Sequence, residues 1–266
     1  MKPIAKDIIR DLELVRVQSP LVHNITNYVA MNLTANALLA VGASPVMAHA
    51  VEEVEDMVAI ASALVINIGT LSEPWIKAMS RAAMAAGRKG IPIIYDPVGV
   101  GATPFRTRTI LALLEAARPA VIRGNASEIM ASAGASSRTK GVDSAVAAAS
   151  ALDSARTLSQ RHDCVVCVSG ETDHIVSKSD LTMIKNGHAL MPRVTGLGCT
   201  ASALCGAFAA VNSDYFAATV SAMVVMGIAG EIAAEKSSGP GSMQVQFLDA
   251  LFNLTGAEIE KRLKMA

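Results

Sequence analysis

The sequence alternates short apolar runs with alanine-rich segments of helical periodicity, and this alternation limits the folds open to the chain. Strand–helix repeats of this kind give a mostly parallel sheet with helices on both faces. We therefore predict a single α/β domain over residues 1–266, with three layers in the order helix, sheet, helix. The runs expected as strands are Pro20–Thr26, Ser44–Met47, Ala63–Gly69, Ile91–Pro97, Ala120–Asn125 and Cys164–Gly170.

The pattern changes in the second half of the chain. His174–Asp180 and Leu181–Gly187 are closely spaced and polar-flanked, which predicts a hairpin. Two uncharged apolar stretches follow, Val194–Ser213 and Tyr215–Gly230, each apolar enough to suggest a membrane span. Both contain Gly, Ser and Thr, and Asp214 separates them. We interpret them as buried core helices, so no membrane partner is expected.

Charge and cysteine content narrow the class of protein. Lys plus Arg and Asp plus Glu number 23 each, a balance that argues against a nucleic-acid partner. The first residues mix charged and aliphatic side chains, unlike a secretory signal, so four cysteines indicate a reducing compartment, and we expect a cytoplasmic protein. Cys164 and Cys167 would face opposite sides of one strand, which predicts core thiols and no metal site.

Polar residues follow the ends of two predicted strands. Asp96 comes directly before a proline and two glycines, and Arg123, Asn125 and Glu128 follow the next strand. Ligands of parallel sheets bind beyond the carboxyl ends of the strands, so we expect one shared site here. Asp96 suits Mg²⁺, Arg123 suits a nucleotide phosphate, and Asn125 with Glu128 could organise the ion. Each segment also has a purely structural interpretation, as an Asx-turn and a helix capping box.

A glycine-rich turn ending at Gly198 opens an apolar helix at Cys199. The unpaired N–H groups and the dipole of a helix start favour a bound anion. No P-loop motif occurs, and the G-x-G-x-x-A match lacks the flanking strands of a dinucleotide fold. We predict phosphoryl transfer in which Cys199, its pKa lowered at the helix start, orients the acceptor hydroxyl and accepts its proton. The alternative is that Cys199 is only a small buried residue.

Five segments in order resemble the hydroxyethylthiazole kinase family of the ribokinase-like superfamily. They are "VHNITNYVAMNLTANALLAVGASPVMA", "DPVGVGATPFR", "RGNASEI", "VSGETD" and "VTGLGCTASA", and the likeness continues to "GPGSMQVQFLDALFNL". It implies ATP- and Mg²⁺-dependent phosphorylation of 4-methyl-5-(2-hydroxyethyl)thiazole at its primary alcohol. It also implies a cytoplasmic homotrimer with sites at subunit boundaries.

The resemblance assigns roles to individual residues. The residues it implies are Asp96 and Glu128 for the metal, Arg123, Asn125, Ser169 and Gly198 for ATP, and Asn27, Met47 and Gly196 for the thiazole. Some family members carry Thr in place of Ser169. Cys199, the implied catalytic residue, stands where ribokinase relatives carry the aspartate of a G-x-G-D motif. Two alternatives are a ribokinase-like kinase or dehydratase for another small alcohol, and a nonenzymatic nucleotide-binding protein.

Overall fold

The computed structural model of the chain describes residues 4–135 and 144–266. The strands are β1 (Leu21–Ile25), β2 (Ser44–Val46), β3 (Ala63–Asn67), β4 (Ile93–Asp96), β5 (Val121–Asn125), β6 (Val165–Ser169), β7 (Asp173–Val176) and β8 (Leu181–Ile184). The helices are α1 (Ala5–Gln18), α2 (Met31–Val41), α3 (Val54–Ile60), α4 (Glu73–Lys89), α5 (Pro104–Ala116), α6 (Ala126–Ser132), α7 (Ser144–His162), the 3₁₀ turn η1 (Met191–Arg193), α8 (Leu197–Val211), α9 (Tyr215–Glu235), α10 (Pro240–Asn253) and α11 (Gly256–Arg262).

All the strands lie in one sheet, in the order β2-β1-β3-β4-β5-β6-β7-β8. The strands from β2 to β6 are parallel, and β7 and β8 add an antiparallel hairpin. The predicted strands and the predicted hairpin are therefore confirmed, with shorter ends. The run expected over Ile91–Pro97, for example, pairs only from Ile93 to Asp96. Its flanking prolines have no N–H to donate to a neighbouring strand.

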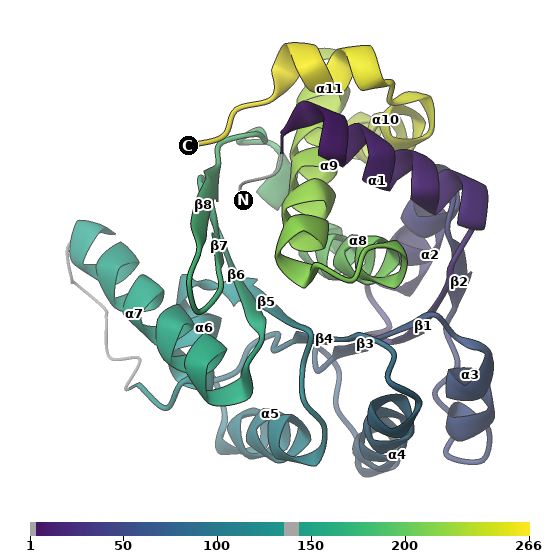
Figure 1. Cartoon of the computed structure of the whole chain (residues 1–266), viewed down its shortest axis with the longest axis vertical. Helices are drawn as coiled ribbons and strands as arrows, with labels where there is room; N and C mark the ends of the chain where they lie inside the picture. The colour runs from purple at the N-terminus through teal and green to yellow at the C-terminus, as the bar shows by residue number, and fades with distance from the viewer. Residues whose placement is uncertain (1–3, 136–143) are drawn as a thin grey trace.

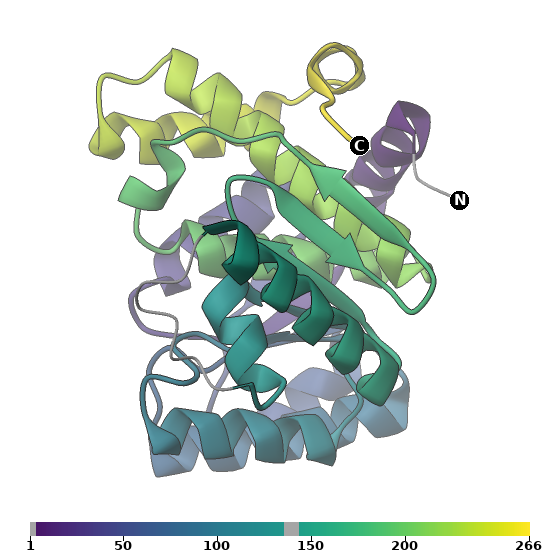
Figure 2. The same ribbon diagram turned by 90° about the vertical axis from the view of Figure 1, so that its left-hand side faces the viewer.

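Helices cover both faces of the sheet, which confirms the predicted three-layer α/β architecture (Figure 1). Helices α1, α2 and α8 to α11 share one hydrophobic core with the sheet, and α3 to α7 share the other. The β7–β8 hairpin extends the sheet at one edge, where β7 contacts α7 on one face and α9 on the other (Figure 2). The two cores therefore pack against the sheet from both sides.

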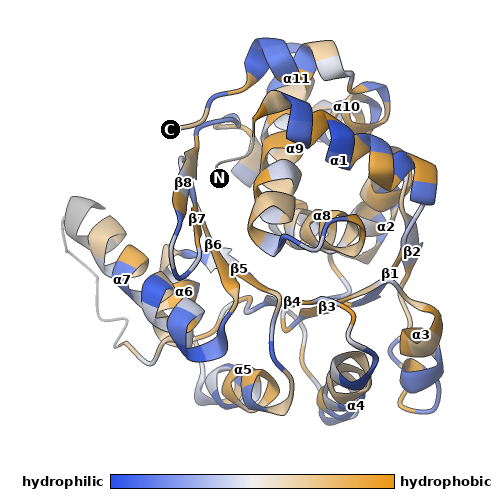
Figure 3. Ribbon diagram, viewed as in Figure 1, coloured by the Kyte–Doolittle hydropathy of each residue, from blue (hydrophilic) through white to orange (hydrophobic). Residues whose placement is uncertain are grey.

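The two uncharged apolar stretches form α8 and α9, as predicted. Helices α8 and α9 and the central strands are mostly hydrophobic, while α11 presents hydrophilic residues (Figure 3). Among the described residues, α9 is the one helix that is long and apolar enough to cross a membrane. Of its most apolar 18-residue stretch, 94% is buried inside the fold. Its apolar surface is thus satisfied by packing within the protein.

The cysteines behave as the strand pattern predicts. Cys164, Cys167 and Cys205 are buried free thiols, and Cys199 is the one that remains partly exposed. Burial raises the pKa of the Cys167 thiol well above its ordinary value. Buried thiols of this kind pack as small apolar side chains in the core.

Candidate active site

A pocket of about 1020 Å³ opens where the strands β4 to β6 end and α8 begins. The predicted site residues among those that line it are Asp96, Arg123, Asn125, Glu128, Ser169, Gly196, Gly198 and Cys199. Parallel strands end at the same edge of a sheet, which is why residues so distant in the sequence meet here. Two predicted residues, Asn27 and Met47, do not line this pocket.

The first turn of α8 faces the pocket without a side-chain cap. Gly196 is its N-cap, with a φ of 87° that favours glycine, and no side chain accepts from the first N–H groups. Arg123 Nη1 donates to the Gly198 carbonyl at 2.9 Å, which places a guanidinium against the same turn. Open N–H groups, the helix dipole and a nearby positive charge are features that suit a bound anion.

Asp96 is the most deeply buried carboxylate that faces the pocket, with 1% of its surface exposed. Its Oδ2 accepts hydrogen bonds from Asn67 Nδ2 at 2.7 Å and from Ser202 Oγ at 2.9 Å. Its Oδ1 is buried and has no hydrogen-bond partner. Burial raises the pKa of Asp96 to about 6, with Arg123 lowering it and Glu128 raising it. The carboxylate is therefore mostly ionised at neutral pH and has one oxygen available for a ligand.

Asn125 and Glu128 form a reciprocal capping box at the start of α6. Asn125 Oδ1 accepts from the Glu128 N–H at 3.0 Å, and Glu128 Oε2 accepts from the Asn125 N–H at 2.9 Å. Glu128 Oε1 also accepts from the Gly99 N–H at 2.9 Å, which ties the loop after β4 to α6. The structural interpretation of this segment is therefore confirmed. A carboxylate oxygen with one such bond retains a second lone pair, so the cap leaves room for a ligand.

The donor set at this edge suits a magnesium ion that keeps most of its water. Asp96 and Glu128 lie within electrostatic range of one another. Residues 4–135 and 144–266 contain no cluster of three or more His, Cys, Asp or Glu side chains that could enclose a metal. Mg²⁺ often binds through one or two carboxylates, water and substrate phosphates, and does not need a cage built entirely from protein. The unpaired Asp96 Oδ1 fits such an ion.

A chain of side-chain amides connects Asp96 to Cys199. Asn67 Oδ1 accepts from Asn27 Nδ2 at 2.9 Å, and the same Asn27 nitrogen donates to Cys199 Sγ at 3.2 Å. Asn27 Oδ1 accepts from the Ala30 N–H at 3.0 Å. The Asn27 amide is thus engaged on both sides, and it holds the Cys199 sulfur in a fixed orientation.

The expected lowering of the Cys199 pKa is wrong. Burial raises the pKa of this thiol to about 11, and the negative charge of Asp96 adds to the effect. The hydrogen bonds from Asn27 and Asn67 and the charge of Arg123 act in the opposite direction but do not compensate. Desolvation disfavours the thiolate more strongly than the surrounding dipoles and charges favour it. Cys199 is a neutral thiol at physiological pH.

Sequence reasoning missed Asn67 and Ser202, which are both fully buried and both donate to Asp96. Asn67 was detectable, because it is a polar residue at the end of an apolar strand, like Asp96 and Asn125. Ser202 carries no comparable signal, since a serine inside an apolar helix more often bonds to its own backbone.

The remaining predicted residues lie at the two sides of the site. Ser169 ends β6, and its hydroxyl donates to the Gly124 carbonyl at 3.2 Å. Met47 is half-buried and follows β2, the edge strand at the opposite end of the sheet from β8. The predicted residues that line the pocket are therefore assembled in this one chain, whereas Met47 stands apart from them.

Comparison with known proteins gives a consistent result. Residues 12–257 match the model of the hydroxyethylthiazole kinase family. The chain belongs to this family. It is 60% identical over 255 residues to the hydroxyethylthiazole kinase of Syntrophus aciditrophicus, covering 96% of this chain and 94% of that protein. It is 58% identical over 260 residues to the Leptospira biflexa hydroxyethylthiazole kinase, covering 98% and 97%.

Solved structures agree with the family assignment. The hydroxyethylthiazole kinase protein of Pyrococcus horikoshii superposes with a TM-score of 0.90 at 44% identity, covering 98% of both chains. Pyridoxal kinase from Staphylococcus aureus has a TM-score of 0.63 at 15% identity, over 80% of this chain and 88% of that one. A ribokinase-like superfamily protein of Enterococcus faecalis gives 0.64 at 12% identity, over 87% and 86%. These two share the fold alone. The family match confirms that the chain is a kinase. It does not favour the alternative hypothesis of a ribokinase-like kinase or dehydratase that acts on another small alcohol.

Proposed function

We propose that this chain transfers a phosphoryl group from ATP to the primary hydroxyl of 4-methyl-5-(2-hydroxyethyl)thiazole, as in thiamine biosynthesis and salvage. The family match and the names of its relatives support this activity. The observation that carries the chemistry is the meeting, in one pocket, of the uncapped start of α8 with Arg123 and two carboxylates. One continuous sheet supports treating residues 1–266 as a single kinase domain.

In this proposal, the N–H groups of the first turn of α8, including that of Gly198, receive the transferred phosphoryl group. Arg123 binds the nucleotide phosphates, and Asn125 and Ser169 line the ATP side of the pocket. Phosphoryl transfer has a loose transition state, so positioning and charge stabilisation provide most of the rate. The N–H groups of α8 and the guanidinium of Arg123 would supply both the positioning and the charge stabilisation.

Asp96 and Glu128 would hold Mg²⁺, which neutralises phosphate charge when it is bound. The free Asp96 Oδ1 and the second lone pairs of Glu128 support this assignment. Cys199 is the proposed catalytic residue. As a neutral thiol it would orient the alcohol and would not accept its proton. The hydroxyl keeps this proton until the new O–P bond has largely formed and then releases it to an oxygen of the transferred phosphoryl group or to water, so no strong base is required. Asn27 positions the thiol through its 3.2 Å hydrogen bond.

The thiazole itself would bind near Gly196 and the Asn27–Cys199 pair, with Met47 packing its thioether on the flat ring. Met47 stands apart from the pocket of its own chain, so another copy would complete the thiazole side, in a homotrimer of the kind that the family resemblance implies. We further propose a cytoplasmic location, in keeping with four free thiols.

The proposed function is tested by ATP turnover of the purified protein with Mg²⁺ against a panel of thiazole, pyrimidine and sugar alcohols. We expect ADP release that is stimulated by hydroxyethylthiazole above all others. The absence of thiazole-stimulated ADP release, from protein with an intact circular dichroism spectrum, would reject the proposal.

Replacing Cys199 with aspartate should leave an active enzyme, with kcat within about tenfold of the unaltered protein, because a base contributes modestly to a loose transition state. Asn27 Nδ2 can donate to a carboxylate as it does to the sulfur. Initial rates of ADP release measure this. Trapping of a phosphorylated cysteine, or complete loss of activity in a folded Cys199→Asp variant, would contradict it.

The Glu128→Gln variant should require at least about tenfold more Mg²⁺ for half-maximal rate, while the KM for the thiazole alcohol changes little. The variant loses a charge from the ion site and one of two backbone bonds, since an amide has only one acceptor oxygen. Titration of the initial rate with Mg²⁺ gives the result. If the titration is unchanged, Glu128 is only a helix cap.

A further inference from the structure

One wall of the pocket is an irregular segment between β8 and η1. Its residues Lys185 to Ala189, with Met191, line the pocket together with Met223, Met226 and Gly227 of α9. Phosphate is assigned to the start of α8, so this thioether-rich part is left for the flat, apolar base of the nucleotide. A segment without regular secondary structure needs outside contacts to keep a fixed position there.

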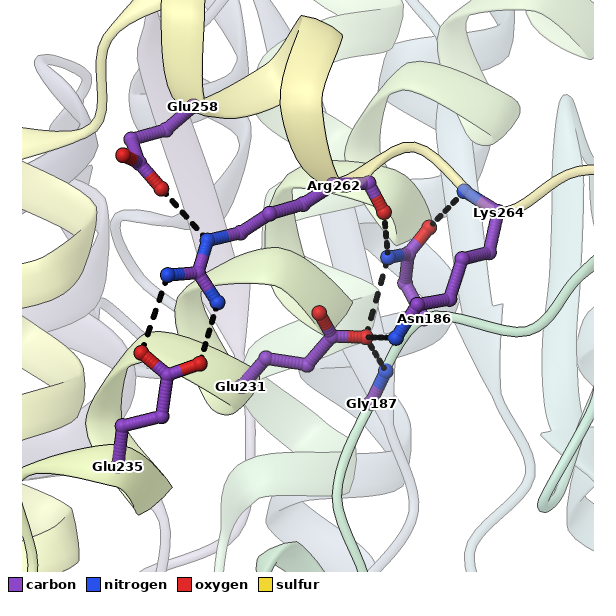
Figure 4. A network of polar contacts seen from close by, with 7 residues as sticks. All are labelled: Asn186, Gly187, Glu231, Glu235, Glu258, Arg262 and Lys264. Atoms are coloured by element: carbon purple, nitrogen blue, oxygen red, sulfur yellow. Dashed lines mark hydrogen bonds and ion pairs between the residues drawn. The ribbon is translucent and has the colours of Figure 1, made fainter.

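Glu231 supplies such contacts from α9. Its side chain is 10% exposed, and its Oε1 accepts from Asn186 Nδ2 at 3.1 Å, from the Gly187 N–H at 3.1 Å and from Lys264 Nζ at 3.0 Å (Figure 4). A carboxylate buried to this degree is stable only when it is fully paired. The pairing thus binds the pocket wall to α9.

Asn186 connects the same wall to a second element. Its Nδ2 donates to the Arg262 carbonyl at 2.7 Å, and its Oδ1 accepts from the Lys264 N–H at 2.9 Å (Figure 4). Residues 264–266 continue beside β8, where the Lys185 N–H donates to the Lys264 carbonyl at 2.9 Å and Met183 and Ala266 exchange two bonds at 3.0 Å. The Asn186 side chain therefore connects the pocket wall to residues 262–264 through both its amide nitrogen and its amide oxygen.

Gly227 brings α9 against this wall at close range. A Cβ added at Gly227 would lie 2.7 Å from both the Cβ and the carbonyl oxygen of Asn186. Gly227 and Glu231 are one turn apart, so the same face of α9 packs closely against the wall at Gly227 and accepts hydrogen bonds from it at Glu231. The same helix packs along α8, whose first turn is the proposed phosphate site. Helix α9 thereby sets the spacing between the wall and the phosphate end.

We infer that Glu231 and Asn186 are positioning residues for nucleotide binding. Together with residues 262–266 they hold the wall that receives the nucleoside end of ATP at a fixed distance from α8. The inference rests on the proposed ATP-dependent function, and it assigns Glu231 and Asn186 to holding this wall in place.

The test compares Glu231→Ala, Glu231→Gln and Asn186→Ala with the unaltered protein. Calorimetry with a nonhydrolysable ATP analogue and Mg²⁺ gives the nucleotide Kd, and initial rates give kcat and the two KM values. Loss of buried hydrogen bonds of this kind should raise the analogue Kd and the ATP KM by about tenfold in Glu231→Ala and Asn186→Ala. Glu231→Gln, which keeps one acceptor, should be intermediate. The kcat and the thiazole KM should stay within about twofold.

Glu235→Ala is the matched control, because Glu235 lies one turn further along α9, has no bond to the wall, and pairs with the Arg262 guanidinium at 2.6 and 3.0 Å (Figure 4). In this variant the guanidinium keeps its bond to Glu258, so the Arg262 carbonyl that accepts from Asn186 should stay in place. Its nucleotide Kd should be unchanged. If Glu231→Ala does not fold, the near-isosteric Glu231→Gln carries the test through its own ATP KM. The inference fails if the folded Glu231 variants bind the analogue like the unaltered protein, or if Glu235→Ala loses as much affinity. If the unaltered protein binds the analogue but does not use the thiazole, only the proposed substrate is wrong.

Discussion

The Asp96→Asn variant is expected to lose kcat by about 100- to 1000-fold while it remains folded, the loss typical of removing a preorganised electrostatic group. Asp96 Oδ2 accepts from Asn67 and Ser202, and an amide oxygen in the same place keeps both bonds. What the variant removes is the negative charge and the unpaired Oδ1. The change therefore tests the charge at the pocket without disturbing the network that holds it.

The measurement is the initial rate of thiazole-dependent ADP release at saturating ATP, with a thermal melt to show that the fold persists. Ser202→Ala serves as the control, since it removes one donor to Oδ2 and retains the charge, and its kcat should fall by less than about tenfold. If the kcat of the Asp96→Asn variant is within tenfold of that of the unaltered enzyme, Asp96 is a structural residue. The assignment of Asp96 as a magnesium ligand would then be rejected.

The second large effect is on stability: Ala203→Asp, or a charge at Ala207, is expected to prevent folding. Both alanines are fully buried on α8, which packs against β1, β3 and β4 on one side and α9 on the other. An unpaired carboxylate in such a core costs at least several kcal/mol, comparable to the total stability of about 5–15 kcal/mol of a typical domain. The Ala203 variant should appear as insoluble or unfolded protein.

Ala210→Asp is the appropriate comparison, because it makes the same change near the end of the same helix, where the side chain is only partly buried. It should yield soluble protein with a cooperative thermal transition. Soluble, folded Ala203→Asp that merely lacks activity would mean that the packing of α8 is far looser than its burial indicates.

Patterns in the sequence were sufficient for the architecture and for most of the pocket. Six strands, a hairpin and two buried helices follow from apolar periodicity, because apolar residues recur at the positions that face the core. Asp96, Asn125, Glu128 and Ser169 each end or follow a strand of the parallel sheet, Arg123 lies two residues before the end of β5, and such ends share one edge. The sequence therefore predicts that these side chains lie close together.

The properties that depend on neighbours distant in the sequence required the tertiary structure. The Cys199 thiol was expected to be acidic from its place at a helix start, yet burial and the charge of Asp96 raise its pKa to about 11. The contacts of the Asn27 amide with Asn67 and Cys199 likewise follow from no local pattern. Local patterns report propensity, whereas desolvation and hydrogen-bond saturation depend on everything packed around a group.

The sequence alone thus determined the three-layer fold and the edge of the sheet that carries the site, since both depend on periodicity and strand direction. The contacts of Glu231 with Asn186, Gly187 and Lys264 were decided only by the tertiary structure (Figure 4). Those residues belong to separate segments with no shared pattern, and a hydrogen bond of about 3 Å forms only after packing has brought the segments together.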